Sequence, residues 1–286
     1  MSASGATAAE GPLREFRLRG GLAADNSDGW GLAYGDNGVF HVFKEPEPAA
    51  QSLLFAELCN SVRSNLILAH VRKANHPPIN TMTNTHPFKH TCCGKEWVFA
   101  HNGLVPDIVN LELGRENPVC RPAGETDSEH AFCHLLGYIA QQLQDTHLTE
   151  TAAWFQTLVT VSEQVTSYGK FNFLMSDGEY LVAYGHDRLH HCEQHNANSP
   201  INTPLNRVLI ATAPLNGNER WIAFEPGELR VYRLGRLAGR MTTQPSRALR
   251  TSANPSFDST PMVQGLDGSR ATYFSIESAN INLALS

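Results

Sequence analysis

The order of apolar segments along the chain is the feature that most restricts its fold. Strand-like segments come first, two consecutive amphipathic helical segments follow, and further strand-like segments occupy the later part. Strands grouped before and after helices, instead of alternating with them, favour antiparallel sheets covered by helices. A dinucleotide-binding doubly wound sheet is disfavoured because no glycine-rich turn joins a first strand to a helix. We therefore predict an α+β fold in which two antiparallel sheets pack together with helices outside.

Periodicity and turn signals place the individual elements. Residues 29–45 alternate apolar and polar side chains around Asp36-Asn37-Gly38, which indicates a β-hairpin. Residues 171–185 and 221–235 hold strand pairs joined by Asp-Gly and Pro-Gly turns. Single strands are predicted at 65–72, 96–103 and 207–215, and helices at 49–62, 127–144 and 151–165.

One domain accounts for most of the chain. The 286 residues, of which 41% are hydrophobic, suffice for one large folded domain, and we predict that it spans residues 1–241. From Thr242 onward the sequence is rich in Ser, Thr, Asn and Pro and poor in apolar residues. Residues 242–286 are therefore predicted to form a disordered tail.

Charge and composition exclude several classes of function. The net charge of −6 gives no basic surface for nucleic acid or an anionic membrane. No apolar run reaches the ~18–20 residues that span a bilayer, and the N-terminus does not resemble a secretory signal. The six cysteines are too few and too scattered for a disulfide scaffold, so we expect reduced thiols in a cytoplasmic protein.

Polar residues at the ends of apolar segments are candidates for a functional site. His70 and Arg72 end the predicted strand at 65–72, Asn102 and Gly103 end the one at 96–103, and Asp127 begins a helix. Each has a purely structural explanation. Arg72 could form a surface ion pair, Asn102-Gly103 a tight turn, and Asp127 or its neighbour a helix cap.

Five short motifs, taken in order, resemble the class II glutamine amidotransferases, whose nucleophile is the N-terminal residue. They are DGWG at 28–31, AHVRKAN at 69–75, NTHPF at 84–88, AHNG at 100–103 and GETDSE at 124–129. The similarity runs from about Arg17 to about Leu234. It is closest to the short, stand-alone members, which include amidohydrolases of the ergothioneine pathway and of glutathione degradation. The resemblance implies a four-layer αββα sandwich of two antiparallel sheets.

The resemblance also implies roles in binding glutamine or a γ-glutamyl compound. Arg72 is expected to hold the α-carboxylate, a task suited to a planar, bidentate guanidinium. Asp127 is expected to pair with the α-ammonium group. Asn102 and Gly103 are expected to form the oxyanion hole, through a side-chain amide and a backbone N–H.

Other matched positions have supporting roles in the family. Asn75 and His86 fall near the pocket, and Trp30 supports the site through packing. No cofactor and no metal is expected. The released ammonia or acyl group would go to water, to a small molecule or to a separate acceptor or synthase subunit.

The nucleophile is the part of the resemblance that the sequence does not match. In the family, a cysteine becomes the first residue when the initiator methionine is removed. Its thiolate attacks the γ-carbonyl, with the α-amino group as base. Here Met1 is followed by Ser2, and the nearest cysteine is Cys59. Relatives open with methionine, cysteine and about four mostly apolar residues before an internal methionine, which Met1 resembles.

Four interpretations remain open. A start codon assigned too late would leave the chain inactive, place its N-terminus near the cleft, and shorten or remove the first strand of one sheet. A pseudoenzyme would bind glutamine or a γ-glutamyl group without turnover. Ser2 could replace the nucleophile, although about six residues out of register. A structural αββα subunit would bind no amino acid.

A cluster of zinc-ligand types lies outside these motifs. The segment LHHCEQH gathers His190, His191, Cys192 and His195. It lacks a second ligand cluster at matching spacing, so we interpret it as a polar surface turn. Cys133, on the apolar face of its helix, is interpreted as a core residue.

Overall fold

The computed structural model describes residues 1–74, 79–111, 119–145, 151–196, 205–215 and 220–243. All of them belong to one compact unit that spans residues 1–246. The last described strand reaches Thr242, and Thr243 bonds back to Gly227. The remainder of the predicted tail lies outside the described residues.

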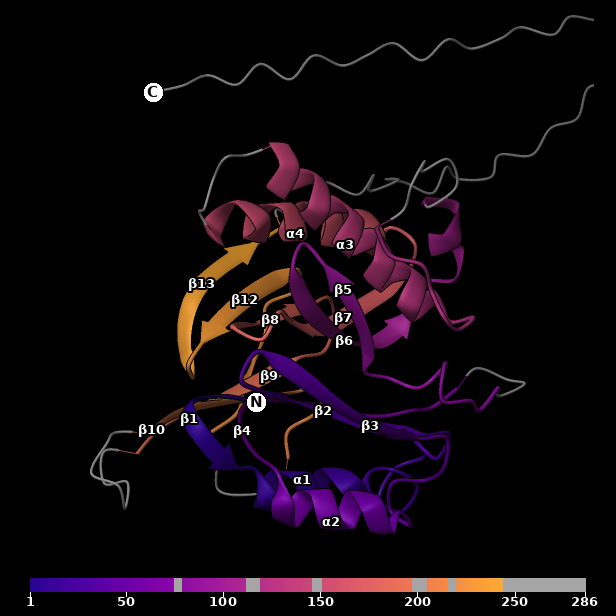
Figure 1. Cartoon of the computed structure of the whole chain (residues 1–286), viewed down its shortest axis with the longest axis vertical. Helices are drawn as coiled ribbons and strands as arrows, with labels where there is room; N and C mark the ends of the chain where they lie inside the picture. Colours follow the sequence, from indigo (N-terminus) through magenta and orange to yellow (C-terminus); the bar gives the residue numbers. More distant parts are fainter. Residues whose placement is uncertain (75–78, 112–118, 146–150, 197–204, 216–219, 244–286) are drawn as a thin grey trace, which may run out of the picture. The chain divides into compact units, whose positions relative to one another are not determined.

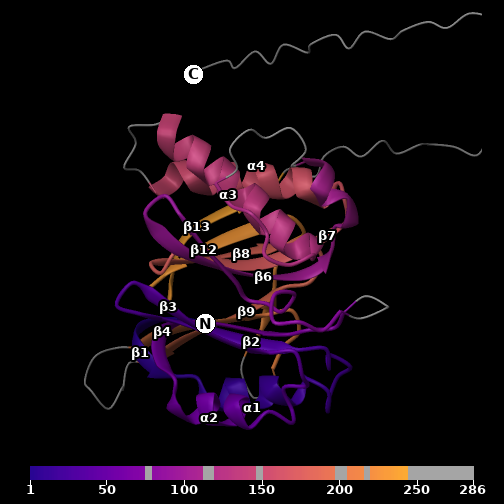
Figure 2. The ribbon, with the colours of Figure 1, turned by 45° about the vertical axis from the view of Figure 1, so that its right-hand side comes forward.

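Two antiparallel sheets lie face to face, and a pair of helices covers each outer face (Figure 1). Figure 2 shows the same order of layers from another side. The predicted αββα sandwich is confirmed. No helix in the described part of the chain is long and apolar enough to cross a membrane. A cytoplasmic location stays a prediction.

The first sheet has seven strands and contains the start of the chain. Its order is β11 (Ile222–Ala223), β9 (His190–Asn196), β10 (Leu205–Ala211), β1 (Ser2–Ala8), β4 (Arg63–Val71), β2 (Trp30–Asp36) and β3 (Val39–Glu45). Its outer face carries α1 (Glu10–Leu18) and α2 (Leu53–Ser61). Helix α2 begins where Ser52 accepts the N–H of Phe55 with its hydroxyl, as an N-cap does.

The second sheet has six strands and carries the longer helices. Its order is β13 (Arg236–Thr242), β12 (Glu228–Arg233), β8 (Tyr180–Gly185), β7 (Lys170–Ser176), β6 (Lys95–Leu104) and β5 (Phe88–Cys92). Helices α3 (Asp127–Asp145) and α4 (Thr151–Thr166) cover its outer face, and the short 3-10 helix η1 (Pro106–Leu111) follows β6.

Three apolar cores separate the four layers. One lies between α1, α2 and the first sheet, around Trp30 and Phe55. A second lies between the sheets, around Leu68, Val98 and Tyr232, and the third packs α3 and α4 on the second sheet. Strands such as β4 and β6 are therefore covered on both faces, which explains why they read as short apolar runs.

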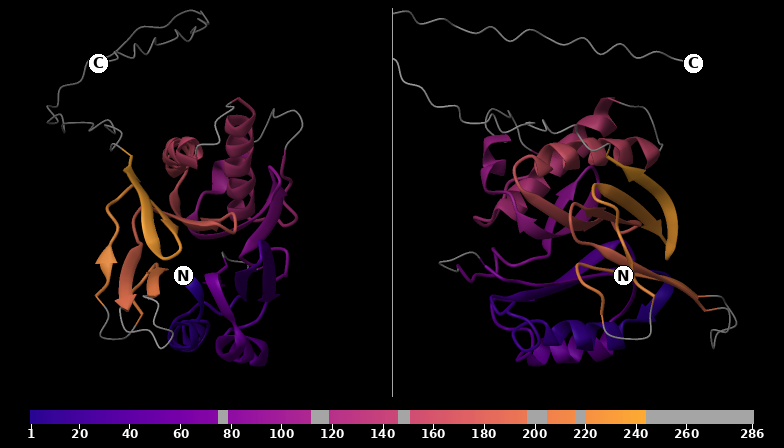
Figure 3. Two further views of the ribbon diagram at one scale, coloured as in Figure 1. Left: turned by 60° about the vertical axis from the view of Figure 1, so that its left-hand side comes forward. Right: turned by 180° about the vertical axis from the view of Figure 1, so that it is seen from behind.

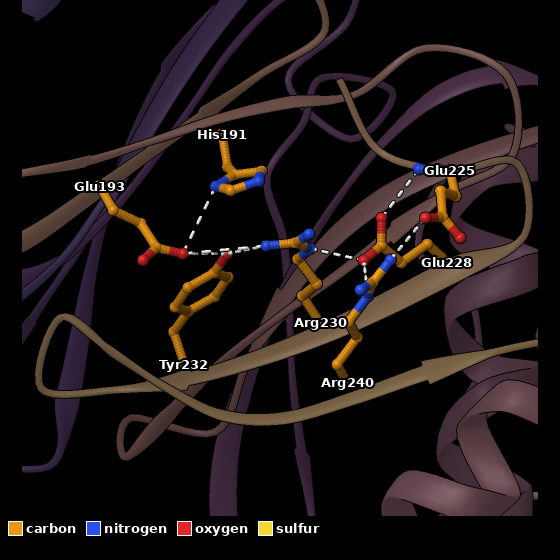
Figure 4. A network of polar contacts seen from close by, with 7 residues as sticks. All are labelled: His191, Glu193, Glu225, Glu228, Arg230, Tyr232 and Arg240. Atoms are coloured by element: carbon orange, nitrogen blue, oxygen red, sulfur yellow. Dashed lines mark hydrogen bonds and ion pairs between the residues drawn. The ribbon is translucent and has the colours of Figure 1, made fainter. Parts of the chain in front are cut away.

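A buried polar network joins β9 of the first sheet to the β12–β13 hairpin of the second (Figure 4). These strands also lie beside each other in Figure 3. The centre of this network is Glu228, which is 0% exposed and accepts hydrogen bonds from both Arg230 and Arg240. The remaining members are His191, Glu193, Glu225 and Tyr232.

Three expectations about the chain were wrong. The segment LHHCEQH is not a surface turn, because it forms β9 between β10 and β11, with His191 and Cys192 buried. The two strands predicted as a pair within 221–235 do not pair with each other, because β11 belongs to the first sheet and β12 to the second. Reduced thiols were expected throughout, but Cys120 and Cys133 form a disulfide, so Cys133 is more than a core residue.

Candidate functional site

The ends of β4 and β6 meet across the two sheets through a pair of histidines. The Nε2 atom of His70 lies 3.1 Å from the carbonyl oxygen of His101, to which it donates as the neutral tautomer. His86 then directs its Nδ1 toward the His70 ring, 3.0 Å from Nε2 and 3.3 Å from Nδ1. Burial is the main cause that lowers the pKa of all three imidazoles, that of His70 to about 3. At neutral pH this cluster is therefore uncharged.

Arg72 follows β4 and is held by the turn before β2. Its backbone N–H donates to Gly29 and its carbonyl accepts from Asp28. The guanidinium donates through Nη1 to the Asp28 carbonyl at 3.2 Å and to Asn80 Oδ1 at 3.0 Å. Arg72 is 9% exposed, and burial lowers its pKa. These contacts do not match the surface ion pair that was the structural alternative.

Asp127 begins α3 but does not cap it. The hydroxyl of Thr126 accepts the N–H of Glu129 and so performs the capping. Asp127 instead accepts the N–H of Val105 with Oδ2 at 2.6 Å, which fixes the chain just after β6. The carboxylate is thereby tied to the segment that follows Asn102 and Gly103.

Ser128 connects Asp127 to the histidine cluster. Its Oγ lies 2.8 Å from Nδ1 of His101 and 3.3 Å from Oδ1 of Asp127. Nε2 of His101 contacts the Lys170 carbonyl at 3.1 Å and must donate there. Neutral His101 therefore accepts at Nδ1, and the single hydroxyl proton of Ser128 goes to it. Oδ1 of Asp127 keeps its lone pairs for another donor.

Asn102 and Gly103 form part of β6 instead of a tight turn. They pair with Asn172 and Phe171 of β7, and the Asn102 carbonyl accepts from the Asn172 side chain at 3.0 Å. Gly103 has φ +155°, and a Cβ there would collide with the Lys170 carbonyl oxygen. Glycine is required at this position by that close approach of β7.

The remaining motifs pack around the same strand ends. A Cβ on Gly31, in DGWG, would collide with the His86 carbonyl oxygen. Asn84, in NTHPF, accepts the N–H of Glu125, in GETDSE, at 2.9 Å. Trp30 is fully buried. Asn75 lies outside the described residues.

A cavity of about 350 Å³ opens beside these strand ends. His70, His101 and Asn102 contribute to its lining, and so does Met1. Among the described residues, Arg72, Gly103 and Asp127 are near neighbours of this lining in sequence but not part of it. The sequence pattern gave no signal for the contributions of Ser128, Val105 and Asn80, which depend on contacts between distant segments.

Comparison with known proteins identifies the family. The sequence model of the class II glutamine amidotransferases ("Glutamine amidotransferases class-II") matches residues 1–256. The chain belongs to this family. "Putative glutamine amidotransferase YafJ" of Escherichia coli (strain K12) is 36% identical over 235 residues, covering 76% of this chain and 89% of that protein.

Two further similarities bear on the fold and on the substrate. The crystal structure of a predicted glutamine amidotransferase from Pseudomonas aeruginosa PA01 superposes with a TM-score of 0.59 at 26% identity, covering 78% of this chain and 91% of that one. "Gamma-glutamyl-hercynylcysteine sulfoxide hydrolase" of Mycobacterium tuberculosis is 32% identical over 84 residues, or 29% of this chain and 34% of that protein.

Proposed function

We propose that this class II glutamine amidotransferase domain cleaves the γ-amide bond of glutamine or of a γ-glutamyl compound through a cysteinyl thioester. The observation that carries the proposal is the chain of contacts from His70 through His101 and Ser128 to Asp127. It gathers the family's motifs at one end of the two sheets. The partial similarity to a γ-glutamyl hydrolase supports this substrate class.

Substrate binding is assigned to one buried cation and one carboxylate. The bonds of Arg72 to described residues run through Nη1, so its other N–H groups serve the substrate α-carboxylate. Oδ1 of Asp127 accepts the α-ammonium group, since Oδ2 is used by Val105. His86 supports the pocket from behind His70, and Asn75 is placed near it by its motif alone.

The chemical step follows from the charges that develop. A thiolate attacks the γ-carbonyl carbon, and the oxyanion is stabilised by the Asn102 amide and the Gly103 N–H. The C–N bond then breaks, and the ammonia or amine leaves with a proton from the α-amino group that served as base. Water hydrolyses the thioester and regenerates the thiol. The released group goes to water, a small molecule or a separate acceptor or synthase subunit.

The register of β1 supports a position for the nucleophile before Met1. Ser2 lies opposite Leu66 of the antiparallel β4. In this register, each step backwards along β1 pairs with one step forwards along β4. The fifth residue before Met1 would therefore lie opposite Arg72. Ile67 of β4, Leu209 of β10 and residues that follow each of them line the cavity. The edge of β4 that faces away from β1 is paired with β2, and the corresponding edge of β10 is paired with β9. A strand that continues β1 backwards therefore fits between them, and a cysteine at its start would reach the substrate.

The experiment extends the chain by a cysteine and four apolar residues before Met1, expressed behind an initiator methionine. We expect ammonia release from glutamine or a γ-glutamyl amide, and loss of about 10⁶ in rate when that cysteine is replaced by alanine. An extension one residue shorter is the control, because it moves the cysteine one position along the strand, where its side chain points to the opposite face of the sheet. Robust turnover by the chain that begins at Met1 would contradict the proposal and favour Ser2.

Binding without turnover is the alternative function. The surroundings of Met1 favour it, because they hold the α-amino group of Met1 within the pairing of β1 with β4 instead of beside a nucleophile. This group donates to the Ile67 carbonyl at 2.7 Å, and burial lowers its pKa to about 5. If the extended variant is inactive yet calorimetry detects glutamine or γ-glutamyl binding that Arg72→Ala abolishes, the domain is a binding module. If neither the chain that begins at Met1 nor the cysteine-extended protein binds these compounds, both functions are excluded.

A further inference from the structure

A second cluster of reactive side chains lies behind the N-terminus of α3. Ligand atoms of His90, Cys120 and Cys133 all lie within 4.8 Å of one another. Cys120 and Cys133 are 7% and 5% exposed, and their sulfur atoms form the disulfide. The three residues come from β5, from the segment before α3 and from α3 itself.

A carboxylate completes the surroundings of this cluster. Oε1 of Glu129 lies 2.9 Å from Nε2 of His90, and the Glu129 side chain is 4% exposed. Its other oxygen accepts the N–H of Gly124 at 2.7 Å. A disulfide needs neither an imidazole nor a carboxylate beside it. Two thiolates and an imidazole supply three ligands of a zinc site whose fourth position water can take, and a carboxylate bonded to the imidazole is the usual support of such a ligand.

We propose that Cys120, Cys133 and His90 form a zinc site when the disulfide is reduced, with Glu129 orienting the imidazole. A dithiol reductant transfers two electrons and two protons to the disulfide and is itself oxidised to a disulfide. The two resulting thiols lose their protons on binding Zn²⁺, and the imidazole binds as the neutral base. Thiolate and imidazole ligands favour zinc over magnesium or calcium, which take oxygen ligands.

The cluster lies beside the segment 120–126, which leads into Asp127 at the start of α3. The disulfide to Cys133 attaches the Cys120 end of this segment to α3, and Glu129 accepts the N–H of Gly124 near its other end. Glu125 in turn donates its backbone N–H to Asn84 of the NTHPF motif. The disulfide and the zinc site are thus two alternative anchors for one end of this segment, and reduction without metal would free its Cys120 end.

The test is a metal titration of the full chain. Protein prepared without metal is reduced with a dithiol, freed of reductant under inert gas, and titrated with Co²⁺ and then with Zn²⁺. We expect one Co²⁺ per chain with thiolate-to-metal charge-transfer absorption, displacement by Zn²⁺, and a zinc-dependent rise in Tm. The oxidised protein is expected to bind neither metal at this site.

Variants separate the site from adventitious binding. Cys120→Ser and Cys133→Ser are expected to remove the charge-transfer band, and Glu129→Gln to weaken affinity roughly 10- to 100-fold. Cys93→Ser is the control, because Cys93 is an exposed cysteine outside the cluster and should leave binding unchanged. Circular dichroism verifies that each variant is folded. Reduced, folded protein that binds no Co²⁺, or binding that survives in the double cysteine variant, would overturn the proposal.

Discussion

His70 of β4 and His101 of β6 are bonded side chain to main chain, with 3.1 Å between Nε2 and the carbonyl oxygen. The bond joins the two sheets where their strands end, and it requires His70 to be a neutral donor or a cation. Burial strongly favours the neutral form. The junction therefore depends on pH.

Stability is expected to fall on acidification through this cluster. The folded pKa of His70 is about 3, whereas an unfolded histidine has a pKa of about 6.5. The unfolded chain therefore binds more protons below pH 6.5, so the stabilisation is fully present above that pH and is lost as the pH falls toward 3. The slope is up to about 1.4 kcal/mol per pH unit for each such histidine. Urea unfolding between pH 7.5 and 5 measures it. His70→Gln should flatten the slope, and His41→Gln, at an exposed position, should not.

Arg72→Ala in the cysteine-extended protein should chiefly weaken substrate binding. The substitution leaves the substrate α-carboxylate without its charge-assisted partner in a buried pocket, so KM should rise much more than kcat falls. Arg72→Lys should recover binding only in part, because an ammonium lacks the planar fork. Steady-state kinetics with glutamine checks both variants. If Arg72→Ala lowered kcat and left KM unchanged, Arg72 would act in the chemical step instead of in substrate binding.

Asn102→Ala in the same protein should lower kcat with little change in KM. The amide is needed when the oxyanion forms, and loss of one such donor costs about 10²–10³ in rate. Single-turnover measurement of thioester formation is the direct readout. A change confined to KM would remove Asn102 from the oxyanion hole.

Gly31→Ala should destabilise the fold strongly. The added Cβ would collide with the carbonyl of His86 and approach Pro87 Cδ to 2.8 Å, so the NTHPF segment must move. We expect a loss of about 3 kcal/mol or more, as for other overpacked backbone contacts. Gly11→Ala in α1 is the matched control, since nothing lies within 4 Å of its Cβ. It should stabilise the helix by about 0.5–1 kcal/mol. Thermal unfolding of the two variants compares them, and similar Tm values would contradict the expected clash.

Glu228→Gln should cost about 3–5 kcal/mol, because it removes the nearer carboxylate partner of the buried Arg230. The side chain of Arg230 is 11% exposed and that of Glu228 is 0% exposed. Glu225→Gln is the control within the same network (Figure 4), since the Glu225 side chain is 64% exposed and its pair with Arg240 should contribute 0–1 kcal/mol. Denaturant midpoints give both values. Equal effects would mean that the network stabilises the fold through surface charge.

Local signals made part of the fold predictable. The hairpin at Asp36-Asn37-Gly38 and helices α2, α3 and α4 each carry their own turn, cap or apolar period, and each was confirmed. Strand β9 was missed because HHCEQH is polar by composition and is buried through its pairing with β10 and β11. Helix α1 was missed because Gly11 and Pro12 weaken its first turn as a signal.

The candidate site was predictable as a set of positions but not as a set of contacts. The motif order identified Arg72, Asn102, Gly103 and Asp127, whose roles stay predictions. The Thr126 cap frees Asp127 to hold Val105, and the TDSE sequence left open which of the two residues caps the helix. Ser128 donates its hydroxyl proton to His101 because the other ring nitrogen of His101 donates to the carbonyl of Lys170, which is distant in sequence. Contacts of this kind depend on how strands from separate regions align.

The place of β1 between β4 and β10 also constrains how the chain can fold during synthesis. Ser2 pairs with Leu66 on one side and with Val208 on the other. At about 5–20 residues per second, roughly 10–40 s pass on the ribosome between the synthesis of Ser2 and that of its second partner. During that interval the first sheet has an unpaired edge in what becomes its middle, with Ala3 still in water. Such an edge is a template for intermolecular pairing, so production yield should depend on chaperones and temperature more than final stability would suggest.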